Sequence, residues 1–304
     1  MGGEAAPPPA VGVVTGFTGE IGFEIVRKVA QHAHVIVPVR DEAKAATLVQ
    51  RITSEAAGAS IEVVPNVDLA SIASIEAFCA QIADRKLNFL VNNAAVTTQR
   101  KSLSRDGVEL MFAVNVLAYQ LLITRLAPQL EREGGRIVNV ASDYAGAFRA
   151  DDFVFDARRF SCTAAYQQSK AADRMLTAEA SRRYASIKIN ACHPGVVTSP
   201  LLKALMGDGG QGWDTAEAAA DTPAYLAVAP EIEARKVTGR YFASRSPQKC
   251  EFATQVDNQR ALWEFCDALV ARHGDTDRAF ANARRAAGAG DYSQYGAFYK
   301  ENAY

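Results

Sequence analysis

The sequence AVGVVTGFTGEIGFEIVRKVAQ, residues 10–31, decides the fold. The apolar, β-branched run at 10–16 is typical of a strand that is buried on both faces, and residues 20–31 have the pattern of a helix. Gly16, Gly19 and Gly22 stand where the first gives way to the second. Such glycines can make a tight turn that brings backbone amides and a helix N-terminus toward a pyrophosphate. The segment therefore predicts a strand-turn-helix unit that can hold a dinucleotide.

The alternation of strands and helices continues along the chain. Further strand-like runs are HVIVPV (34–39), IEVV (61–64), LNFLVNN (87–93), RIVNVAS (136–142), IKINACHPG (187–195) and GRYFAS (239–244). Helix-like stretches follow the early strands, as in DEAKAATLVQRITSEA and SIASIEAFCAQIADR. This order predicts a single α/β domain with a Rossmann-like, doubly wound, mainly parallel seven-stranded sheet flanked by helices. Pro38 should lie near the end of its strand because it lacks an amide donor.

The composition is that of a soluble globular protein with a small-molecule ligand. The chain has 304 residues, 49% of them hydrophobic and 22% charged, which is enough to bury a large core. With 33 Lys plus Arg against 34 Asp plus Glu, the formal net charge is −1. No broad basic field favours nucleic acid or an anionic membrane. We therefore expect no nucleic-acid partner and no membrane partner.

The cysteines and the chain ends indicate a cytoplasmic protein without a metal. Five scattered cysteines with no C-x-x-C pair argue against a disulfide framework and a zinc site, and the four histidines have no ligand spacing. No run of about 18 apolar residues occurs, and the start MGGEAAPPPA has neither a basic flank nor an apolar signal core. We expect a disordered leader at 1–9, a dinucleotide-binding and catalytic domain at 10–272 and a C-terminal extension at 273–304.

A tyrosine and a lysine stand four residues apart in AYQQSK, at Tyr166 and Lys170. If residues 161–184 form a helix, both side chains share a face and the ammonium can lie near the phenol. A nearby cation lowers the pKa of a phenol from its usual value of about 10, which makes it a usable general acid or base. Ser142, at the end of a predicted strand, could hold a substrate oxygen. The alternative is a surface helix with a solvated lysine.

Arg40 bears on the choice of dinucleotide. It follows Val39 at the end of the second predicted strand. An acid there would bind the ribose 2′-hydroxyl of NAD(H), whereas the planar fork of arginine suits the 2′-phosphate of NADP(H). NADP(H) is therefore favoured and NAD(H) is less favoured. Arg40 could instead be a solvated loop charge, and Asp41 could weaken its field or cap the next helix.

Together these segments resemble the short-chain dehydrogenase/reductase family over about residues 10–272. TGFTGEIG is similar to the family's cofactor turn, VDL at 67–69 to its adenine-contacting segment, NNAA at 92–95 to its NNAG motif and HPGVVTSP at 193–200 to its PG motif. The resemblance implies a catalytic set of Asn115, Ser142, Tyr166 and Lys170, in which Asn115 holds a helix distortion. It implies cofactor contacts at Thr15, Gly16, Gly19, Ile21, Gly22, Arg40, Asp68, Leu69, Asn93, Ala94, Tyr166, Lys170, Pro194, Gly195, Val197 and Thr198.

A closer resemblance is to the retinol-dehydrogenase-like and protochlorophyllide-reductase-like branch of the family, through PVRDEAKA, AYQQSKAADRML and GRYFAS. The branch implies NADP(H) and the reduction or oxidation of apolar carbonyls and alcohols. Its photochemical members carry a cysteine where this chain has Ala172, so photochemistry is disfavoured. Phe148, Phe153, Phe155, Phe160 and Trp213 could line an apolar pocket. Dimers and tetramers are common in the family, so a homo-oligomer is compatible with this resemblance.

Two departures from the family pattern keep a second hypothesis open. Glu20 replaces the middle glycine of the cofactor turn, and Ala95 replaces the glycine of NNAG. A carboxylate beside a pyrophosphate would weaken cofactor binding. We expect an NADP(H)-dependent carbonyl reductase or alcohol dehydrogenase in which Tyr166 is the general acid/base. The alternative is a non-catalytic, cofactor-binding regulatory protein of the same fold; a sugar-nucleotide epimerase is disfavoured by NNAA and the short C-terminal region.

Overall fold

An open, mainly parallel sheet lies at the centre of the fold. The computed structural model describes residues 9–286, and the surroundings of side chains within 9–274. In this part of the chain the strand order is β3-β2-β1-β4-β5-β6-β7-β8, and only β7 and β8 pair antiparallel. The strands are β1 (Ala10–Val14), β2 (Ala33–Pro38), β3 (Ser60–Val64), β4 (Phe89–Asn92), β5 (Arg136–Val140), β6 (Lys188–Cys192), β7 (Tyr241–Ala243) and β8 (Ser246–Gln248). The predicted α/β fold with a doubly wound sheet is confirmed.

The sequence predicts seven strands, and the sheet has one more, β8, at its edge. Ser244 and Arg245 link β7 to β8 with φ angles of 48° and 59°, the left-handed values of a two-residue hairpin turn. The three residues of β8 are all exposed and carry no apolar alternation, so the sequence pattern gives no sign of a strand. Pro38 is the last residue of β2, as predicted.

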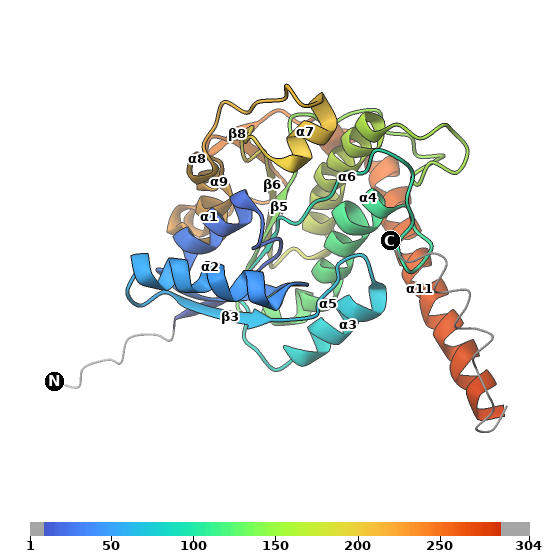
Figure 1. Cartoon of the computed structure of the whole chain (residues 1–304), viewed down its shortest axis with the longest axis horizontal. Coiled ribbons are helices and arrows are strands. Elements are labelled where there is room, and N and C mark those ends of the chain that lie inside the picture. The colour runs from blue at the N-terminus through green and yellow to red at the C-terminus, as the bar shows by residue number, and fades with distance from the viewer. Residues whose placement is uncertain (1–8, 287–304) are drawn as a thin grey trace. The chain divides into compact units, whose positions relative to one another are not determined.

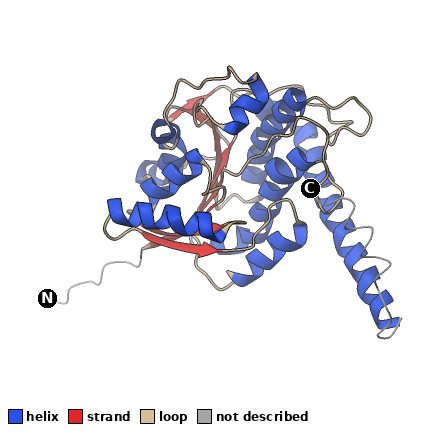
Figure 2. Cartoon of the chain, viewed as in Figure 1, coloured by secondary structure: helices blue, strands red, loops and turns tan. Residues whose placement is uncertain are grey.

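Helices cover both faces of the sheet (Figures 1 and 2). On one face α1, α2 and α9 contribute Val26, Ile52 and Leu226 to a single buried hydrophobic cluster with the strands. On the other face α5 and α6 pack on β4, β5 and β6, and α3 packs on α5. The α-helices are α1 (Glu20–Val29), α2 (Glu42–Glu55), α3 (Ile72–Gln81), α4 (Leu110–Phe112), α5 (Ala118–Arg132), α6 (Cys162–Arg183), α7 (Pro200–Met206), α8 (Ala216–Ala219), α9 (Asp221–Val228), α10 (Pro230–Ala234) and α11 (Val256–Ala286); η1 (Ala113–Leu117) is a π-helical turn and η2 (Glu251–Thr254) a 3₁₀ turn.

Side-chain caps start two of the helices that carry site residues, α6 and α2. Ser161 caps α6 by accepting a hydrogen bond from the Ala164 amide, which confirms the helix predicted at 161–184 within a residue at each end. Asp41 caps α2 in the same way, through the Lys44 amide at 2.9 Å. The Asp41 carboxylate is therefore engaged with the helix that follows Arg40.

One helical stretch in the described residues, Leu110–Arg132, has the length and apolar character of a membrane span. Its most apolar window has a mean hydropathy of 1.6, yet 83% of that window is buried inside the protein. A core helix of a globular fold has the same properties, and this stretch packs between α3 and the sheet. Its apolar character is therefore explained by burial against the protein's own core.

The chain divides into two compact units, Met1–Cys266 and Asp267–Tyr304. The first contains the whole sheet, and the second begins within α11. Residues 1–8 and 287–304 lie outside the described residues, and with them nearly all of the predicted leader at 1–9 and much of the predicted extension at 273–304. Those boundaries stay predictions.

Candidate active site

The turn after β1 is so tight that two of its glycines are required. Gly16 has a φ of +73°, and a Cβ atom there would lie 2.8 Å from the Ala94 Cα. A Cβ atom on Gly22 would lie 2.0 Å from the Gly16 carbonyl oxygen. Gly19, the N-cap of α1, has only an ordinary contact, at 3.4 Å. Close backbone packing therefore explains Gly16 and Gly22, whereas at Gly19 the protein itself leaves space beside the helix N-terminus.

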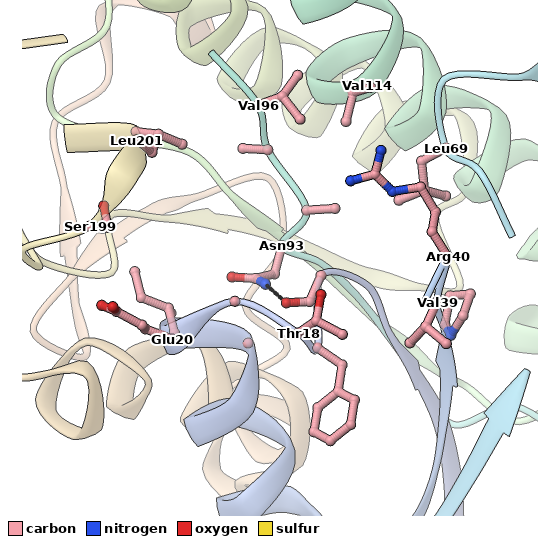
Figure 3. A pocket seen from close by; sticks show the side chains of 18 of the residues that line it. Thr18, Glu20, Val39, Arg40, Leu69, Asn93, Val96, Val114, Ser199 and Leu201 are labelled. Atoms are coloured by element: carbon pink, nitrogen blue, oxygen red, sulfur yellow. Dashed lines mark hydrogen bonds between the residues drawn. The ribbon is translucent and has the colours of Figure 1, made fainter. Parts of the chain in front are cut away.

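The end of β4 is fastened to the same turn by polar groups. The fully buried Thr15 hydroxyl accepts hydrogen bonds from the amides of Asn93, at 2.9 Å, and Ala94, at 3.1 Å. The Asn93 side chain donates to the Thr15 carbonyl at 2.9 Å. It also reaches the Gly16 carbonyl at 3.5 Å (Figure 3). Thr15 therefore shapes the turn from below and is not itself on its surface.

A cavity of about 600 Å³ lies over this turn. Its volume is in the range of small-molecule and cofactor sites. Of the predicted cofactor-binding residues, ten line it: Gly16, Gly19, Ile21, Gly22, Arg40, Asp68, Leu69, Asn93, Ala94 and Val197. Six predicted residues are not in its lining: Thr15, Pro194, Gly195, Thr198, Tyr166 and Lys170. The Thr198 hydroxyl instead accepts a hydrogen bond from the Gly212 amide at 2.9 Å, and Pro194 and Gly195 border a second cavity.

Arg40 and Lys44 bring two positive side chains to one end of the cavity. Arg40 is exposed just beyond β2, and Figure 3 shows its guanidinium reaching toward Leu69. Lys44, also exposed, lies in the first turn of α2 after the Asp41 cap. The sequence interpretation overlooked Lys44; its place one turn after Arg40, at the start of a helix, was the available sign.

Glu20 lies at the other side of the cavity. It is the exposed first residue of α1, and Figure 3 shows its side chain on the side where Ser199 lies, across from Arg40. Helix N-termini present unpaired amides and a partial positive charge, which attract anions. The Glu20 carboxylate occupies part of that favourable field. A second anion at the same helix end would be repelled by the negative charge of Glu20.

Replacing Glu20 by glutamine should therefore tighten the binding of NADPH about fivefold, because roughly 1 kcal/mol of repulsion between two unit charges is removed. Isothermal titration of Glu20→Gln against wild type measures the effect. Glu264→Gln, which removes an exposed carboxylate outside the cavity, is the matched control. Equal affinities of wild type and Glu20→Gln would show that this carboxylate does not face the bound pyrophosphate.

The predicted catalytic serine and tyrosine are in contact. The Ser142 hydroxyl, just beyond β5, hydrogen-bonds to the Tyr166 phenol of α6, and each residue is only 8% exposed. The Tyr144 amide donates to the Ser142 oxygen at 3.0 Å and fixes its position. Tyr166 also shares a hydrophobic cluster with Val96 and Leu201, two residues of the cavity lining. The cluster thus joins the serine–tyrosine pair to the cavity.

Lys170 is buried beside this pair. It is 2% exposed, and its Nζ atom lies 5.9 Å from the centre of the Tyr166 ring. The ammonium donates to the Val140 carbonyl at 2.9 Å and to the Asp173 carboxylate at 2.8 Å. The alternative interpretation of a surface helix with a solvated lysine is therefore wrong.

The pKa of Tyr166 is raised and not lowered, contrary to the sequence-based expectation. Burial is the largest cause, and the Asp173 charge adds to it. Lys170 and the hydrogen bond from Ser142 lower the pKa, as expected, but they do not outweigh burial. The expectation failed because the pattern showed the cation and could not show how deeply the phenol is buried.

Asn115 holds the loop that follows β4. It lies within the π-helical turn η1, which is the kind of helix distortion that the resemblance implied. Its side chain accepts a hydrogen bond from the Val96 amide at 2.8 Å and donates to the Val96 carbonyl and the Ser169 hydroxyl, both at 3.1 Å. Asn115 therefore links the cavity wall at Val96 to the helix that carries Tyr166.

The predicted set of pocket aromatics divides into three groups. Phe155 and Phe160 pack on each other in the cluster around Tyr166. Phe148 and Phe153 pack together in a separate cluster of rings. Trp213 is 80% exposed and borders the second cavity, of about 740 Å³. The prediction that all five share one pocket is wrong, because aromatic rings in loops pack on the nearest apolar surface.

Comparison with known proteins agrees with the fold. The family model for short chain dehydrogenase matches residues 10–209. Retinol dehydrogenase 13 from Homo sapiens is 32% identical over 289 residues, covering 88% of this chain and 86% of its own length. Short-chain dehydrogenase TIC 32 A, chloroplastic, from Brassica napus is 32% identical over 288 residues, covering 85% and 88%. The crystal structure of a putative NAD(P)-dependent gluconate 5-dehydrogenase from Beutenbergia cavernae, with bound NADP, has a TM-score of 0.62 at 26% identity, covering 77% of this chain and 94% of its own.

The chain therefore belongs to the short-chain dehydrogenase/reductase family of oxidoreductases, which bind nicotinamide cofactors and small-molecule substrates. Within this family its relatives identify it as a member of the retinol-dehydrogenase-like branch.

Proposed function

We propose that the protein is an NADP(H)-dependent oxidoreductase that transfers a hydride between nicotinamide and the carbonyl or alcohol carbon of a small apolar substrate, with Tyr166 as general acid/base. The observation that carries this proposal is the buried set of Ser142, Tyr166 and Lys170 beside a glycine-walled cavity. When bound, the nicotinamide supplies or accepts the hydride, and the protein supplies orientation and the proton.

The arrangement suits carbonyl reduction at neutral pH. A raised pKa keeps the Tyr166 phenol protonated there, which is the form that can donate a proton to the substrate oxygen. Ser142 hydrogen-bonds to the phenol and can hold the same oxygen as negative charge develops on it. The buried Lys170 ammonium stabilises the phenolate that remains after donation. Alcohol oxidation, which requires the phenolate, should become faster as the pH rises.

The glycine turn favours a dinucleotide cofactor, and two cations favour NADP(H) as that dinucleotide. The open side of Gly19 and the N-terminus of α1 would hold the pyrophosphate, while Arg40 and Lys44 would hold a ribose 2′-phosphate. The residue that ends β2 is Pro38, followed by Val39 and Arg40, so no acid follows the strand directly to bind a 2′-hydroxyl. The related gluconate 5-dehydrogenase structure holds NADP.

The surroundings of Tyr166 favour an apolar substrate. Buried Met111 and Phe155 and the partly buried Leu201 and Leu205 form its hydrophobic cluster. Apolar walls around one polar pair orient a substrate by its single oxygen. A cytoplasmic location belongs to the same proposal and is supported by the five cysteines, all of them free thiols.

A non-catalytic, cofactor-binding regulator is the second candidate, because Glu20 lines the cavity at the helix end where a pyrophosphate would lie. Purified protein with NADPH and a panel of carbonyls from short polar to long apolar distinguishes the two. We expect NADPH oxidation that is fastest with apolar ketones and aldehydes. Binding of NADPH without turnover of any carbonyl would favour the regulator.

A further inference from the structure

Asp173 places a buried carboxylate against Lys170. It follows one helical turn later on α6, and its Oδ2 atom accepts a hydrogen bond from the Lys170 Nζ at 2.8 Å. The side chains of the two residues are 0% and 2% exposed. Asp173 is not among the predicted catalytic or cofactor-binding residues, yet its carboxylate contacts one of them, Lys170, directly.

The carboxylate fixes where the ammonium lies. A lysine ammonium has three N–H donors, and two of them are directed to the Val140 carbonyl at the end of β5 and to Asp173. These two contacts tie Lys170 to both the sheet and its own helix. One N–H remains available to a bound ligand.

Asp173 is also the negative charge that balances the lysine. Besides Tyr166, the titratable groups around the pair are Tyr119 of α5, Cys192 of β6 and Arg174 of α6. Burial raises the pKa of the Tyr119 phenol and of the Cys192 thiol, so both are neutral at physiological pH, and Arg174 is a cation. A buried ammonium is unfavourable without an anionic partner. Within the described part of the chain, Asp173 is the anion in hydrogen-bond contact with Lys170 and is therefore that partner.

We propose that Asp173 is a positioning residue that anchors Lys170 and offsets its positive charge, so that the Tyr166 phenol keeps its proton as the pH rises and the site is biased toward carbonyl reduction. This role depends on Tyr166 being the acid of the proposed function. In support, burial lowers the pKa of Lys170 but the Asp173 charge helps to raise it above its usual value, while the same charge adds to the raised pKa of Tyr166. Burial raises the pKa of Asp173 to about 7. The carboxylate is therefore fully ionised, and balances the charge of Lys170, only at pH values above neutrality.

The Asp173→Asn variant tests this role, because the amide keeps the shape and an acceptor but removes the charge. The rate of alcohol oxidation is measured against pH from neutral into the alkaline range. We expect the rising limb of the pH–rate profile, assigned to deprotonation of Tyr166, to move about one pH unit lower. At pH values below this limb, alcohol oxidation should then be about tenfold faster than in wild type. Glu179→Gln is the matched control: it lies on the same helix, and its carboxylate pairs with Arg182 and Arg183. Its profile should follow that of wild type.

A profile of Asp173→Asn that superimposes on wild type would overturn the role. A profile that moves toward higher pH would mean that Lys170 loses its proton without its anionic partner and that the Asp173 charge is not what keeps the proton on Tyr166, so it would overturn the proposal as well. Asp173→Ser, which is smaller and cannot overfill the site, must shift the profile in the same direction as Asp173→Asn. A second readout needs no substrate: tyrosinate absorbance of the cofactor-free protein is titrated, and the Tyr166→Phe signal is subtracted. A lower midpoint in both Asp173 variants supports the role even if no alcohol is oxidised, whereas an unchanged midpoint in both rejects it whatever the activity.

Discussion

Tyr166→Phe should lower kcat for carbonyl reduction about a thousandfold, which is within the contribution of a positioned general acid. The ring is 8% exposed and packs on Met111 and Phe155, and phenylalanine preserves that packing. Only the hydroxyl that meets Ser142 is lost. NADPH affinity should change less than about threefold, because the substitution removes no charge from the cavity lining. Single-turnover reduction with saturating NADPH separates this loss from any effect on binding.

Tyr225→Phe is the control for Tyr166→Phe. Tyr225 is a partly buried tyrosine of α9 that packs on the hydrophobic cluster of the opposite sheet face. Removing its hydroxyl should leave kcat within about twofold of wild type, as for most substitutions far from a site. If Tyr166→Phe kept more than a tenth of the wild-type rate, the proton would have to come from another group, and the acid–base assignment would be wrong.

The fold was predictable because particular residues indicate the backbone conformation that they adopt. Gly16 and Gly22 are required because a Cβ atom at these positions would lie 2.8 and 2.0 Å from backbone atoms. The apolar runs match strands that are buried on both faces. The hairpin that adds β8 was not predictable, since Ser244 and Arg245 are unusual residues for left-handed φ angles. Sequence patterns therefore predict a turn that requires glycine more reliably than a hairpin turn that accepts residues such as Ser244 and Arg245.

The candidate site was predictable in its members but not in its electrostatics. The spacing of Tyr166 and Lys170 indicated that they share a helix face, and they do. Spacing also placed Asp173 one turn beyond Lys170, but a polar helix pattern does not reveal that both side chains are buried. Burial then reversed the expected direction of the pKa of Tyr166. The charge of a neighbour is readable from sequence, whereas the dielectric around it comes only from packing.

Arg40→Ala should weaken NADPH binding about tenfold to a hundredfold, because charged hydrogen bonds to a phosphate contribute roughly 1.5–3 kcal/mol. Arg40 and Lys44 both line the cavity. Lys44→Ala should lose less NADPH affinity than Arg40→Ala, because arginine donates in a planar fork and lysine acts as a point charge. NADH affinity should change less than about twofold in both variants, since NADH has no 2′-phosphate. Titration of each variant with NADPH and NADH gives the four dissociation constants.

Arg51→Ala provides the matched loss of one positive charge from α2. Arg51 pairs with Glu55 on the exposed side of the helix and does not line the cavity, so it changes the net charge without changing the site. A preference for NADPH that falls in Arg40→Ala but not in Arg51→Ala identifies direct contact with the 2′-phosphate, since a long-range field would respond to both and would be screened by salt. Equal losses of NADPH and NADH affinity in Arg40→Ala would instead mean that Arg40 holds a part common to both dinucleotides, and the preference for NADP(H) would have to be abandoned.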